Sequence, residues 1–311
     1  MSKWVLYSLL VGLMVIWGFN VSAIKILVTY FPAASIQGIR ILLAGIAVLS
    51  FLFLSKSLQR VSRKNILGIL VASIFGVVGH HLFLAVGLTT STATNAGLIL
   101  GLIPLCTSIL AMLFLGERFT VSKSLGILVA LVGVYFIVMN DEGSLNGLAI
   151  GDLYLVGAVI TQAISFILIK KLTDNIDSKQ MTGMMLFFGA LMLLVPSLFI
   201  EQVVPTNFVD VPAYVWWILI GSAIIATGLG HVLYNYAMQQ LGAGTTAIFI
   251  NLTPFFSLVG STLFLGEVIT TKHLIGFSCI IAGVILGTGT LKLRYKSKYP
   301  QTEHIKIAEK F

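Results

Sequence analysis

The chain has 311 residues, of which 58% are hydrophobic and only 10% are charged, and its formal net charge is +8. An ordinary soluble domain has about 25% charged residues, which it needs to cover its surface. The composition therefore excludes a soluble enzyme, a nucleic-acid-binding domain and a disordered chain. Together with the mean hydropathy of +1.03, it indicates a protein whose main solvent is lipid.

Apolar stretches long enough to cross a membrane recur along the chain. A spanning helix needs about 20 predominantly apolar residues, and ten such stretches are present. We expect helices at 4–28, 34–54, 66–88, 93–115, 123–139, 152–171, 180–200, 213–238, 243–265 and 272–291. Transmembrane β-strands would be alternating segments of about 10 residues. The length and continuity of these runs therefore predict an all-α integral membrane protein.

The hydrophilic segments between these helices are too short to fold as domains. They lie at 55–65, 140–151, 172–179, 201–212 and 292–311. The sequence has no G-x-x-x-x-G-K-[ST] phosphate loop and no H-E-x-x-H, EF-hand or C-x-x-C motif, so we expect no nucleotide-driven motor, no metal site and no cofactor. Cys106 and Cys279 lie inside apolar stretches, where core packing is their expected role.

The first apolar stretch resembles a secretory signal peptide. Lys3 precedes it, and Val21-Ser22-Ala23 has the small residues of a cleavage site. Cleavage would leave the first half of the chain with one helix fewer than the second half. The internal repeat described below argues against that loss, so we expect residues 4–28 to remain as the first helix.

The distribution of lysine and arginine predicts the orientation, because basic residues concentrate in cytoplasmic loops. With the N-terminus in the cytoplasm, 16 of the 19 basic residues lie on the inner side and only Lys272 on the outer side. Lys25 and Arg40 lie within predicted spans. Both termini are therefore expected in the cytoplasm, and the positive charge is interpreted as a topology signal. The basic tail is either solvated or lies against anionic headgroups.

An internal repeat divides the chain into two halves. The segment Leu113–Glu117 recurs as Leu263–Glu267, at an offset of 150 residues. The same offset pairs Ala93 with Ala243, Pro104 with Pro254, Gly126 with Gly276, Gly133 with Gly283 and His81 with His231. Each copy holds five predicted spans, an odd number, so the copies are expected to be inverted in the membrane. Inverted repeats are a recurring architecture of secondary transporters, with the substrate site near the midplane between the copies.

With these features the chain resembles the EamA-type transporters of the drug/metabolite transporter superfamily, over about residues 4–290. Its first helix carries Trp17-Gly18-x-Asn20, and its second carries Arg40. Both halves have a helix with a small-residue start, a proline and a Leu-Gly-Glu end, followed by a glycine-rich last helix. The resemblance implies two EamA repeats, at 1–140 and 141–291, and a basic cytoplasmic tail at 292–311. It also implies ten helices around a central cavity, lined mainly by helices 1, 3, 4, 6, 8 and 9, and alternating access.

The repeat-equivalent histidines are the most informative polar residues. His81 and His231 lie well inside predicted helices, and ionisable groups at membrane depth usually face a cavity or a partner. Either they line the transport path or carry a proton, or each is neutral and donates to a backbone carbonyl. Tyr234 and Asn235 follow His231 by one helical turn and form a polar stripe with it. We favour a cavity-facing position for this stripe.

Two basic residues lie within predicted spans. Arg40 is about two turns into the second helix, where an unpaired charge is costly. It either attracts an anionic group, such as a substrate carboxylate, or is held by snorkelling or by a backbone carbonyl. Lys25 lies near the outer end of the first helix, and we expect its ammonium group to snorkel to the interface.

Further polar residues are expected at the cavity. Trp17 and Asn20 share one face of the first helix, and Gln162 and Ser165 occupy the equivalent stretch of the sixth. For Asn20, substrate contact and helix–helix hydrogen bonding remain alternatives. Both readings place these four side chains on the inside of the helix bundle.

Pro104 and Pro254 lie near the middle of the fourth and ninth predicted helices. A proline removes one helix hydrogen bond, so a carbonyl one turn earlier is freed. Their occurrence in both copies favours a hinge beside the cavity over a static kink. Asn95 and Asn251 add polar atoms to the same helices and complete the set of predicted cavity residues.

Two glutamates near span ends and two glycines of the last helix are expected to have structural roles. Glu117 and Glu267 lie just past predicted spans, so we expect them to cap or ion-pair with loops rather than to carry protons. Gly283 and Gly287 form a G-x-x-x-G pattern, which indicates close helix packing. Packing within the chain and formation of a homodimer remain open.

The predicted function is transport, not catalysis. No Asp or Glu lies in the interior of a predicted span, whereas proton-coupled transporters commonly use one. We therefore expect facilitated or weakly coupled export of amino acids or related amphiphilic metabolites across the cytoplasmic membrane. The expected partners are a small-molecule substrate and membrane lipid, without nucleic acid.

Three other functions are alternatives to export. Import of a nutrient or cofactor would use the same fold. A membrane-embedded enzyme would need a carboxylate pair, a metal constellation or an activated nucleophile at membrane depth, and the sequence shows none of these. A scaffold without transport activity would not need polar residues at matched positions of the repeat.

Overall fold

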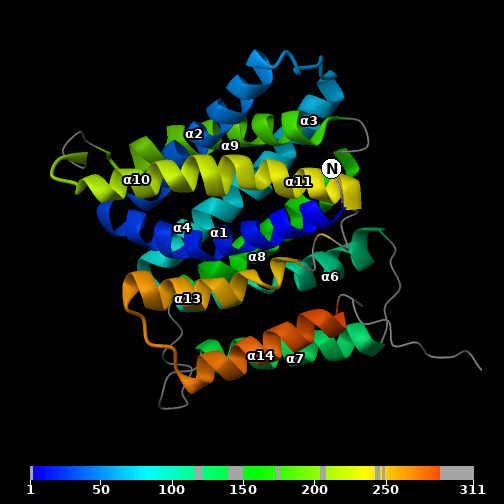
Figure 1. Ribbon diagram of the computed structural model, residues 1–311, viewed down its shortest axis with the longest axis vertical. Coiled ribbons are helices and arrows are strands. Elements are labelled where there is room, and N and C mark those ends of the chain that lie inside the picture. The colour runs from blue at the N-terminus through cyan, green and yellow to red at the C-terminus, as the bar shows by residue number, and fades with distance from the viewer. Residues whose placement is uncertain are drawn as a thin grey trace, which may run out of the picture.

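The computed structural model describes residues 3–115, 121–138, 150–172, 176–203, 208–241, 246 and 249–287. Within these ranges, the regular elements are all helices. They lie roughly side by side in one stack, with α2 (Ala33–Leu54) and α9 (Ser178–Ile200) near one end (Figure 1). The helices α7 (Val121–Val138) and α14 (Thr271–Gly287) form a pair at the other end.

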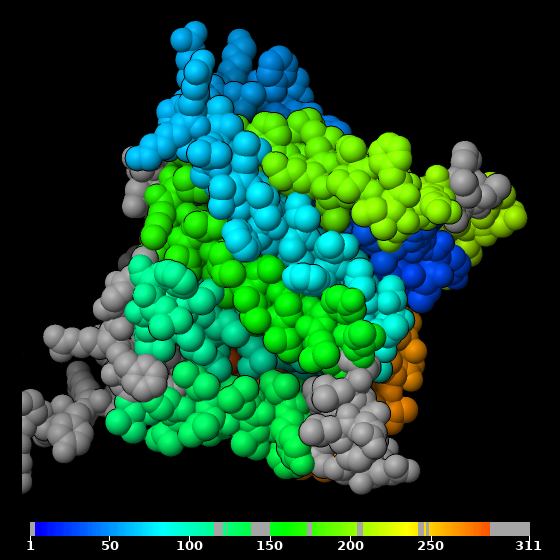
Figure 2. Space-filling model, turned by 180° about the vertical axis from the view of Figure 1, so that it is seen from behind, coloured from blue at the N-terminus to red at the C-terminus, as the bar shows by residue number. Residues whose placement is uncertain are grey.

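The remaining helices fill the stack between these pairs. From the first half of the chain they are α1 (Lys3–Tyr30), α3 (Arg63–Ser73), η1 (Ile74–Gly79), α4 (His80–Thr90), α5 (Ala93–Leu100) and α6 (Ile103–Leu115). From the second half they are α8 (Ile150–Leu172), α10 (Ala213–Gly221), η4 (Ser222–Leu229), α11 (Gly230–Leu241) and α13 (Thr253–Leu265). On the rear face, α3 and α4 run beside α8 (Figure 2). The predicted roles of Glu117 and of the tail 292–311 fall outside the described residues.

The described helices have the length and apolarity of membrane spans. Seven stretches are long enough to cross a bilayer: Trp4–Tyr30, Ala33–Leu54, Arg63–Thr90, Ala93–Phe114, Ile150–Leu172, Ser178–Ile200 and Ala213–Leu241. Three shorter apolar helices lie at Ser124–Ile137, Thr253–Leu265 and Thr271–Leu286. The prediction of an all-helical membrane protein is confirmed. The count of ten spans, their inversion and the side of each terminus stay predictions.

The outer surface of the stack is apolar, as lipid requires. Trp4, Leu54, Phe199 and Trp217 are each more than 70% exposed. A soluble monomer rarely exposes a large contiguous apolar surface, because water would drive such a surface to associate. These side chains are instead solvated when acyl chains surround the helices.

Glycines allow helices from the two halves to approach closely. A Cβ atom on Gly45 of α2 would lie 2.7 Å from the backbone nitrogen of Phe187 in α9. On α14, a Cβ atom on Gly283 would lie 2.6 Å from the backbone nitrogen of Ala130 in α7. Small residues at such crossings are typical of membrane helix packing. Gly283 therefore packs within the chain. The packing of Gly287 lies outside what the structure describes.

Two helices contain a π-helical segment at matching positions. The segment η1 interrupts the continuous helix from Arg63 to Thr90, and η4 interrupts the helix from Ala213 to Leu241. They end at Gly79 and Leu229, which are 150 residues apart. The sequence predicted uninterrupted α-helices here. Because π-segments often occur at functional sites, these interruptions direct attention to the histidines that follow.

The predicted bends at the prolines are displaced. The chain turns at residues 101–102 and again at 251–252, and a new helix begins just before each proline, at Ile103 and Thr253. Pro104 and Pro254 thus lie in the first turn of a helix, where a missing N–H group costs little. The prediction of a mid-helix kink is therefore corrected to a helix break, and the hinge role stays a prediction.

Two glutamates cap the N-termini of helices distant in sequence. The carboxylate of Glu201 accepts the backbone N–H groups of Ala34 and Ser35 at 2.9 and 2.8 Å. The carboxylate of Glu267 accepts those of Ala93 and Thr94 at 2.9 and 2.8 Å. The first turn of a helix has unsatisfied N–H groups and a partial positive charge. The expected capping role of Glu267 is confirmed.

Replacing Glu267 or Glu201 with glutamine is expected to lower the free energy of unfolding by about 1–2 kcal/mol each. The amide keeps one acceptor oxygen but loses the second acceptor and the negative charge. Thermal unfolding in detergent measures the change. Asp210→Asn is the matched control, because Asp210 is exposed. Equal melting temperatures for all four proteins would contradict the capping role.

Candidate functional site

Two adjoining cavities lie between helices of the two halves. The empty space in the larger is about 710 Å³ and in the smaller about 350 Å³, and both are partly open to the surroundings of the protein. They share four lining residues, His81, Gln162, Phe166 and His231. These four therefore form the junction between the cavities.

The larger cavity is bounded by the helices that the family resemblance implies. Its lining side chains come from α1, α4, α5, α6, α8, η4, α11, α13 and the short helical stretch at 249–250. The apolar part of the wall includes Ile24, Leu84, Ile103 and Ile250. The cavity is thus mainly hydrophobic, with a few polar groups that can orient a ligand.

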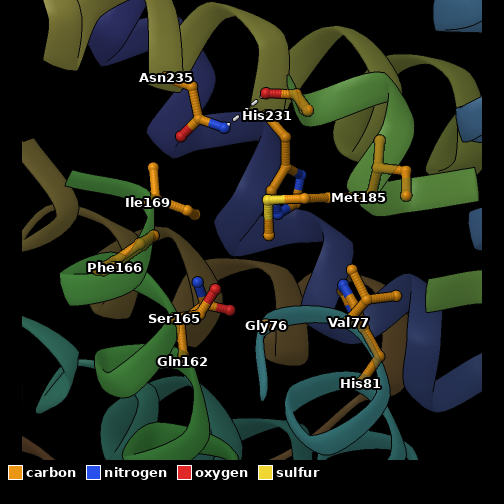
Figure 3. A pocket seen from close by; sticks show the side chains of 12 residues that line it. Gly76, Val77, His81, Gln162, Ser165, Phe166, Ile169, Met185, His231 and Asn235 are labelled. Atoms are coloured by element: carbon orange, nitrogen blue, oxygen red, sulfur yellow. Dashed lines mark hydrogen bonds between the residues drawn. The ribbon is translucent and has the colours of Figure 1, made fainter. Parts of the chain in front are cut away.

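The smaller cavity has more polar walls. Side chains of α4, α8, α9 and α11 converge on it (Figure 3). Ser165 and Gln162 face it from α8, and Asn235 faces it from α11. Nδ2 of Asn235 donates to the hydroxyl of Thr182 at 2.7 Å. This contact joins α11 to α9 at the cavity wall.

Arg40 lies behind the cavity wall and is fully buried. Its Nε donates to Oε1 of Gln37 at 2.8 Å, and its Nη1 donates to the hydroxyls of Ser222 and Thr227, the former at 3.2 Å. Its Nη2 lies 3.2 Å from Nδ1 of His81. The guanidinium group therefore joins α2 to η4 and α4. One predicted alternative was that Arg40 is held by snorkelling or by a backbone carbonyl. Its contacts are instead with four side chains.

The two histidines of the repeat come together at the junction. The ring centroids of His81 and His231 are 6.1 Å apart. Nδ1 of His231 donates to the carbonyl of Thr227 at 2.9 Å, which is the backbone contact expected if the ring is neutral. The same ring also lines both cavities. His80, next to His81 in the chain, also lines the larger cavity and donates through Nδ1 to the carbonyl of Ala158 at 3.0 Å.

An aromatic wall completes the site. The ring of Trp17 packs against His231 and Tyr234, at centroid distances of 5.3 and 5.2 Å, and Phe166 stacks on Tyr234 at 5.7 Å. Nε1 of Trp17 donates to the carbonyl of Ala226 in η4 at 2.9 Å. Tyr234 itself is buried behind this wall rather than in contact with either cavity.

The predicted site residues separate into two groups. Seven line a cavity: Trp17, Asn20, His81, Gln162, Ser165, His231 and Asn235. Six are not among the lining residues: Arg40, Asn95, Pro104, Tyr234, Asn251 and Pro254. Of the second group, Arg40 and Tyr234 contact lining side chains directly. Asn20 accepts a hydrogen bond from Ser222 at 2.5 Å, so it has both a helix partner and a cavity position.

Asn95 belongs to a separate polar cluster at the ends of α4, α5 and α8. Asp152, in the first turn of α8, is buried and accepts from the hydroxyl of Ser91 at 2.5 Å and from Nδ2 of Asn95 at 3.5 Å. Nζ of Lys25 donates to the carbonyls of Leu88 and Ser91 at 2.6 and 2.8 Å. The prediction for Lys25 did not include these two carbonyls, and no contact was predicted for Asp152. Both hold helix ends together.

Sequence reasoning missed several residues of the site. Thr227 and Ser222 bind Arg40, and Phe166 and Thr253 line the larger cavity. Small hydroxyl residues are common in membrane helices, so nothing in the sequence distinguishes these from others. The contacts of Ser222 and Thr227 with Arg40 follow from the register of η4, which the residue pattern does not reveal.

Comparison with known proteins establishes the family of this chain. The EamA-like transporter family matches it over residues 3–139 and 149–288. The chain belongs to the EamA-like transporter family. The match covers both halves separately, in agreement with the resemblance noted from Trp17, Asn20 and Arg40. As a member of the EamA-like family, the chain is a multi-pass membrane transporter in its general class.

Relatives in this family carry the same general description. The uncharacterized transporter YyaM of Bacillus subtilis (strain 168) is 28% identical over 300 residues, covering 94% of this chain and 97% of YyaM. The uncharacterized transporter YetK of the same organism is 28% identical, covering 96% of this chain and 90% of YetK. An uncharacterized transporter of Archaeoglobus fulgidus is 26% identical, covering 92% and 98%.

A solved crystal structure has the same fold as this EamA-family chain. It superposes with a TM-score of 0.64 at 16% sequence identity, and the match covers 92% of this chain and 97% of the other. At this identity the likeness bears on the fold alone. The helix stack of Figure 1 is therefore an architecture already known from experiment.

Proposed function

We propose that the chain is a secondary transporter that exports amino acids or related amphiphilic metabolites across the cytoplasmic membrane by alternating access. The observation that carries the proposal is the pair of cavities between the two halves, joined by His81 and His231. A largely apolar cavity with a few convergent polar groups is suited to a small amphiphilic molecule. Family membership supports transport as the general activity.

Symmetry within the stack supports two inverted five-helix repeats, at 1–140 and 141–291. The π-segments and the helix breaks each occur 150 residues apart. Where α7 meets α14, Gly126 packs against Gly283 and Gly133 packs against Gly276. The repeat makes Gly126 equivalent to Gly276 and Gly133 equivalent to Gly283, so the contact is symmetric between the two halves. Two near-equivalent halves favour inward-open and outward-open states of similar energy, as alternating access requires.

The charges around the cavities support facilitated or weakly coupled transport. Among the described residues, no Asp or Glu lines either cavity. The described cavity walls therefore offer no carboxylate that could carry a proton. The carboxylates of Asp152 and Glu267 instead hold helix ends together. Any coupling to protons would therefore use the histidines.

Import of a nutrient or cofactor by the same fold is the alternative, because the structure does not favour a direction. A membrane-embedded enzyme receives no support from the described part of the chain, which holds no group of three or more His, Cys, Asp or Glu side chains placed to bind a metal ion. A scaffold role would leave the cavities unexplained.

Reconstitution into liposomes tests the proposal. We expect saturable flux of at least one compound from a panel of amino acids, aromatic metabolites and other small amphiphiles, with and without an imposed pH gradient. His81→Ala and His231→Ala are expected to reduce that flux. Absence of flux for the whole panel with folded protein would contradict transport, and full flux with unchanged pH dependence in both variants would contradict a role for the histidines.

Cysteine labelling tests the proposed topology, in which both termini are cytoplasmic. In a background with Cys106→Ser and Cys279→Ser, we expect a cysteine at exposed Ser57 to be protected from a membrane-impermeant maleimide in intact cells. A cysteine at exposed Val209 is expected to react. The reverse pattern would place the termini outside, and labelling of both or neither would contradict an odd number of spans between them.

A further inference from the structure

The cavity wall contains a buried polar atom without a partner. Nε2 of His81 is buried, has no hydrogen-bond partner among the described residues, and belongs to a side chain that lines both cavities. Nearly all buried polar groups in proteins are paired. An unpaired one on a cavity wall therefore marks a position at which a ligand completes the hydrogen bonding.

The contact with Arg40 determines which nitrogen of His81 carries the proton. Nη2 of Arg40 lies 3.2 Å from Nδ1 of His81, and a guanidinium nitrogen only donates. Nδ1 must accept, so the ring is neutral and its proton is on Nε2. The Nε2–H group of His81 is therefore the donor that lacks a partner, and the guanidinium group of Arg40 contacts the other nitrogen of the ring.

The charge of Arg40 has no counter-ion among its described partners. Its donors reach four neutral side chains, those of Gln37, Ser222, Thr227 and His81. The side chain is 0% exposed, and a charge in a low-dielectric interior is screened weakly. The field of this cation therefore favours negative charge in the cavity, and it polarises His81 so that Nε2–H is the stronger donor.

The rest of the wall defines the body of the ligand. Beyond its few polar groups the larger cavity is apolar and aromatic, with Trp17, Leu84, Ile103 and Phe166 on its walls. Gln162 also has an unpaired buried oxygen, Oε1, which only accepts hydrogen bonds and therefore does not bind the anionic group. An apolar skeleton with one anionic group matches this arrangement.

We propose that the cavity binds an apolar monocarboxylate, whose carboxylate accepts a hydrogen bond from Nε2–H of His81 and is attracted by the charge of Arg40. The proposal rests on the proposed transport function, because it names the substrate class of the same cavity. Arg40 acts through His81 as a positioning residue. His81 is the residue that touches the ligand.

A charge series on one skeleton tests this proposal with the purified wild-type protein in nanodiscs. The probes are 3-phenylpropionate, 3-phenylpropanamide and 3-phenylpropylamine, and binding is measured by calorimetry at neutral pH. We expect the carboxylate to bind about tenfold or more tightly than the amide, the ratio that a charge-assisted hydrogen bond gives, and the amine to bind most weakly. Equal binding of the three, tighter binding of the amine, or no binding of the carboxylate would overturn the proposal.

Variants of His81 assign the preference to this side chain. His81→Phe removes the N–H donor and is expected to abolish the preference for the carboxylate over the amide. His81→Gln retains an N–H donor and is expected to keep part of it. His273→Gln changes a half-buried histidine of α14 that lines neither cavity; it is the control and is expected to bind as the wild type. A full preference in a folded His81→Phe protein would overturn the role of His81.

Binding and flux separate this proposal from the transport function. If the carboxylate binds selectively but does not cross the liposome membrane, the transport proposal fails and the ligand assignment stands. If another solute is transported while the charge series shows no preference, the ligand assignment fails and the transport proposal stands.

Discussion

Replacing Gly45 with leucine is expected to lower the free energy of unfolding by about 3 kcal/mol or more. A Cβ atom at this position would lie 2.7 Å from the backbone nitrogen and 2.9 Å from Cα of Phe187. A backbone cannot move aside as a flexible side chain does, so α2 and α9 would have to separate. Thermal or denaturant-induced unfolding in detergent measures the loss, and Arg40 on the same helix would be displaced with it.

Gly12 offers a matched control on the neighbouring helix. A Cβ atom on Gly12 would meet nothing within 4 Å, and the residue is exposed. Gly12→Leu is therefore expected to leave stability unchanged or to raise it by up to about 1 kcal/mol, because leucine favours a helix more than glycine does. If the two variants unfolded at the same temperature, the close approach of α2 to α9 would be contradicted.

Replacing Arg40 with lysine is expected to lower the free energy of unfolding by about 2–4 kcal/mol. Lysine keeps the buried charge but cannot reproduce the planar fork, so it cannot reach Gln37, His81 and the hydroxyls of η4 together. Each buried acceptor left without a donor costs about 1–3 kcal/mol. Arg40→Met, which removes the charge as well, is expected to be the milder change, because it relieves the cost of burying a cation.

The control for this pair is Arg60→Lys, at an exposed arginine before α3, where we expect no measurable change. A charge-series experiment on the Arg40→Met protein gives a second measurement. Its preference for 3-phenylpropionate over the amide is expected to fall by about tenfold. Stability equal to the wild type in both Arg40 variants would show that the hydrogen bonds of the guanidinium group contribute nothing.

The positions of the helices could be predicted because lipid imposes a requirement on each stretch by itself. A run of about 20 apolar residues must form its backbone hydrogen bonds internally, whatever its neighbours are. The predicted limits 34–54 and 180–200 are therefore close to the observed Ala33–Leu54 and Ser178–Ile200. The repeat likewise led to His81 and His231, because matched polar residues are rare against an apolar background.

Partners of polar residues could not be predicted, since they depend on how distant helices pack. Snorkelling was expected of Lys25, and its ammonium group also caps α4, because the end of that helix lies beside it. Ser222 and Thr227 reach Arg40 from within η4, where the chain departs from the α-helical register. The helical period used to assign faces fails across such a segment.

The two halves of the sequence do not correspond to two bodies in space. In the main helix contacts, α7 pairs with α14, α2 with α9, α1 with α13 and α4 with α8, and each pair takes one helix from either half. Neither half therefore has a complete core to fold around without the other. If the gene were cut between α7 and α8, the two fragments should be degraded when made singly and should rebuild a working protein when made in the same cell.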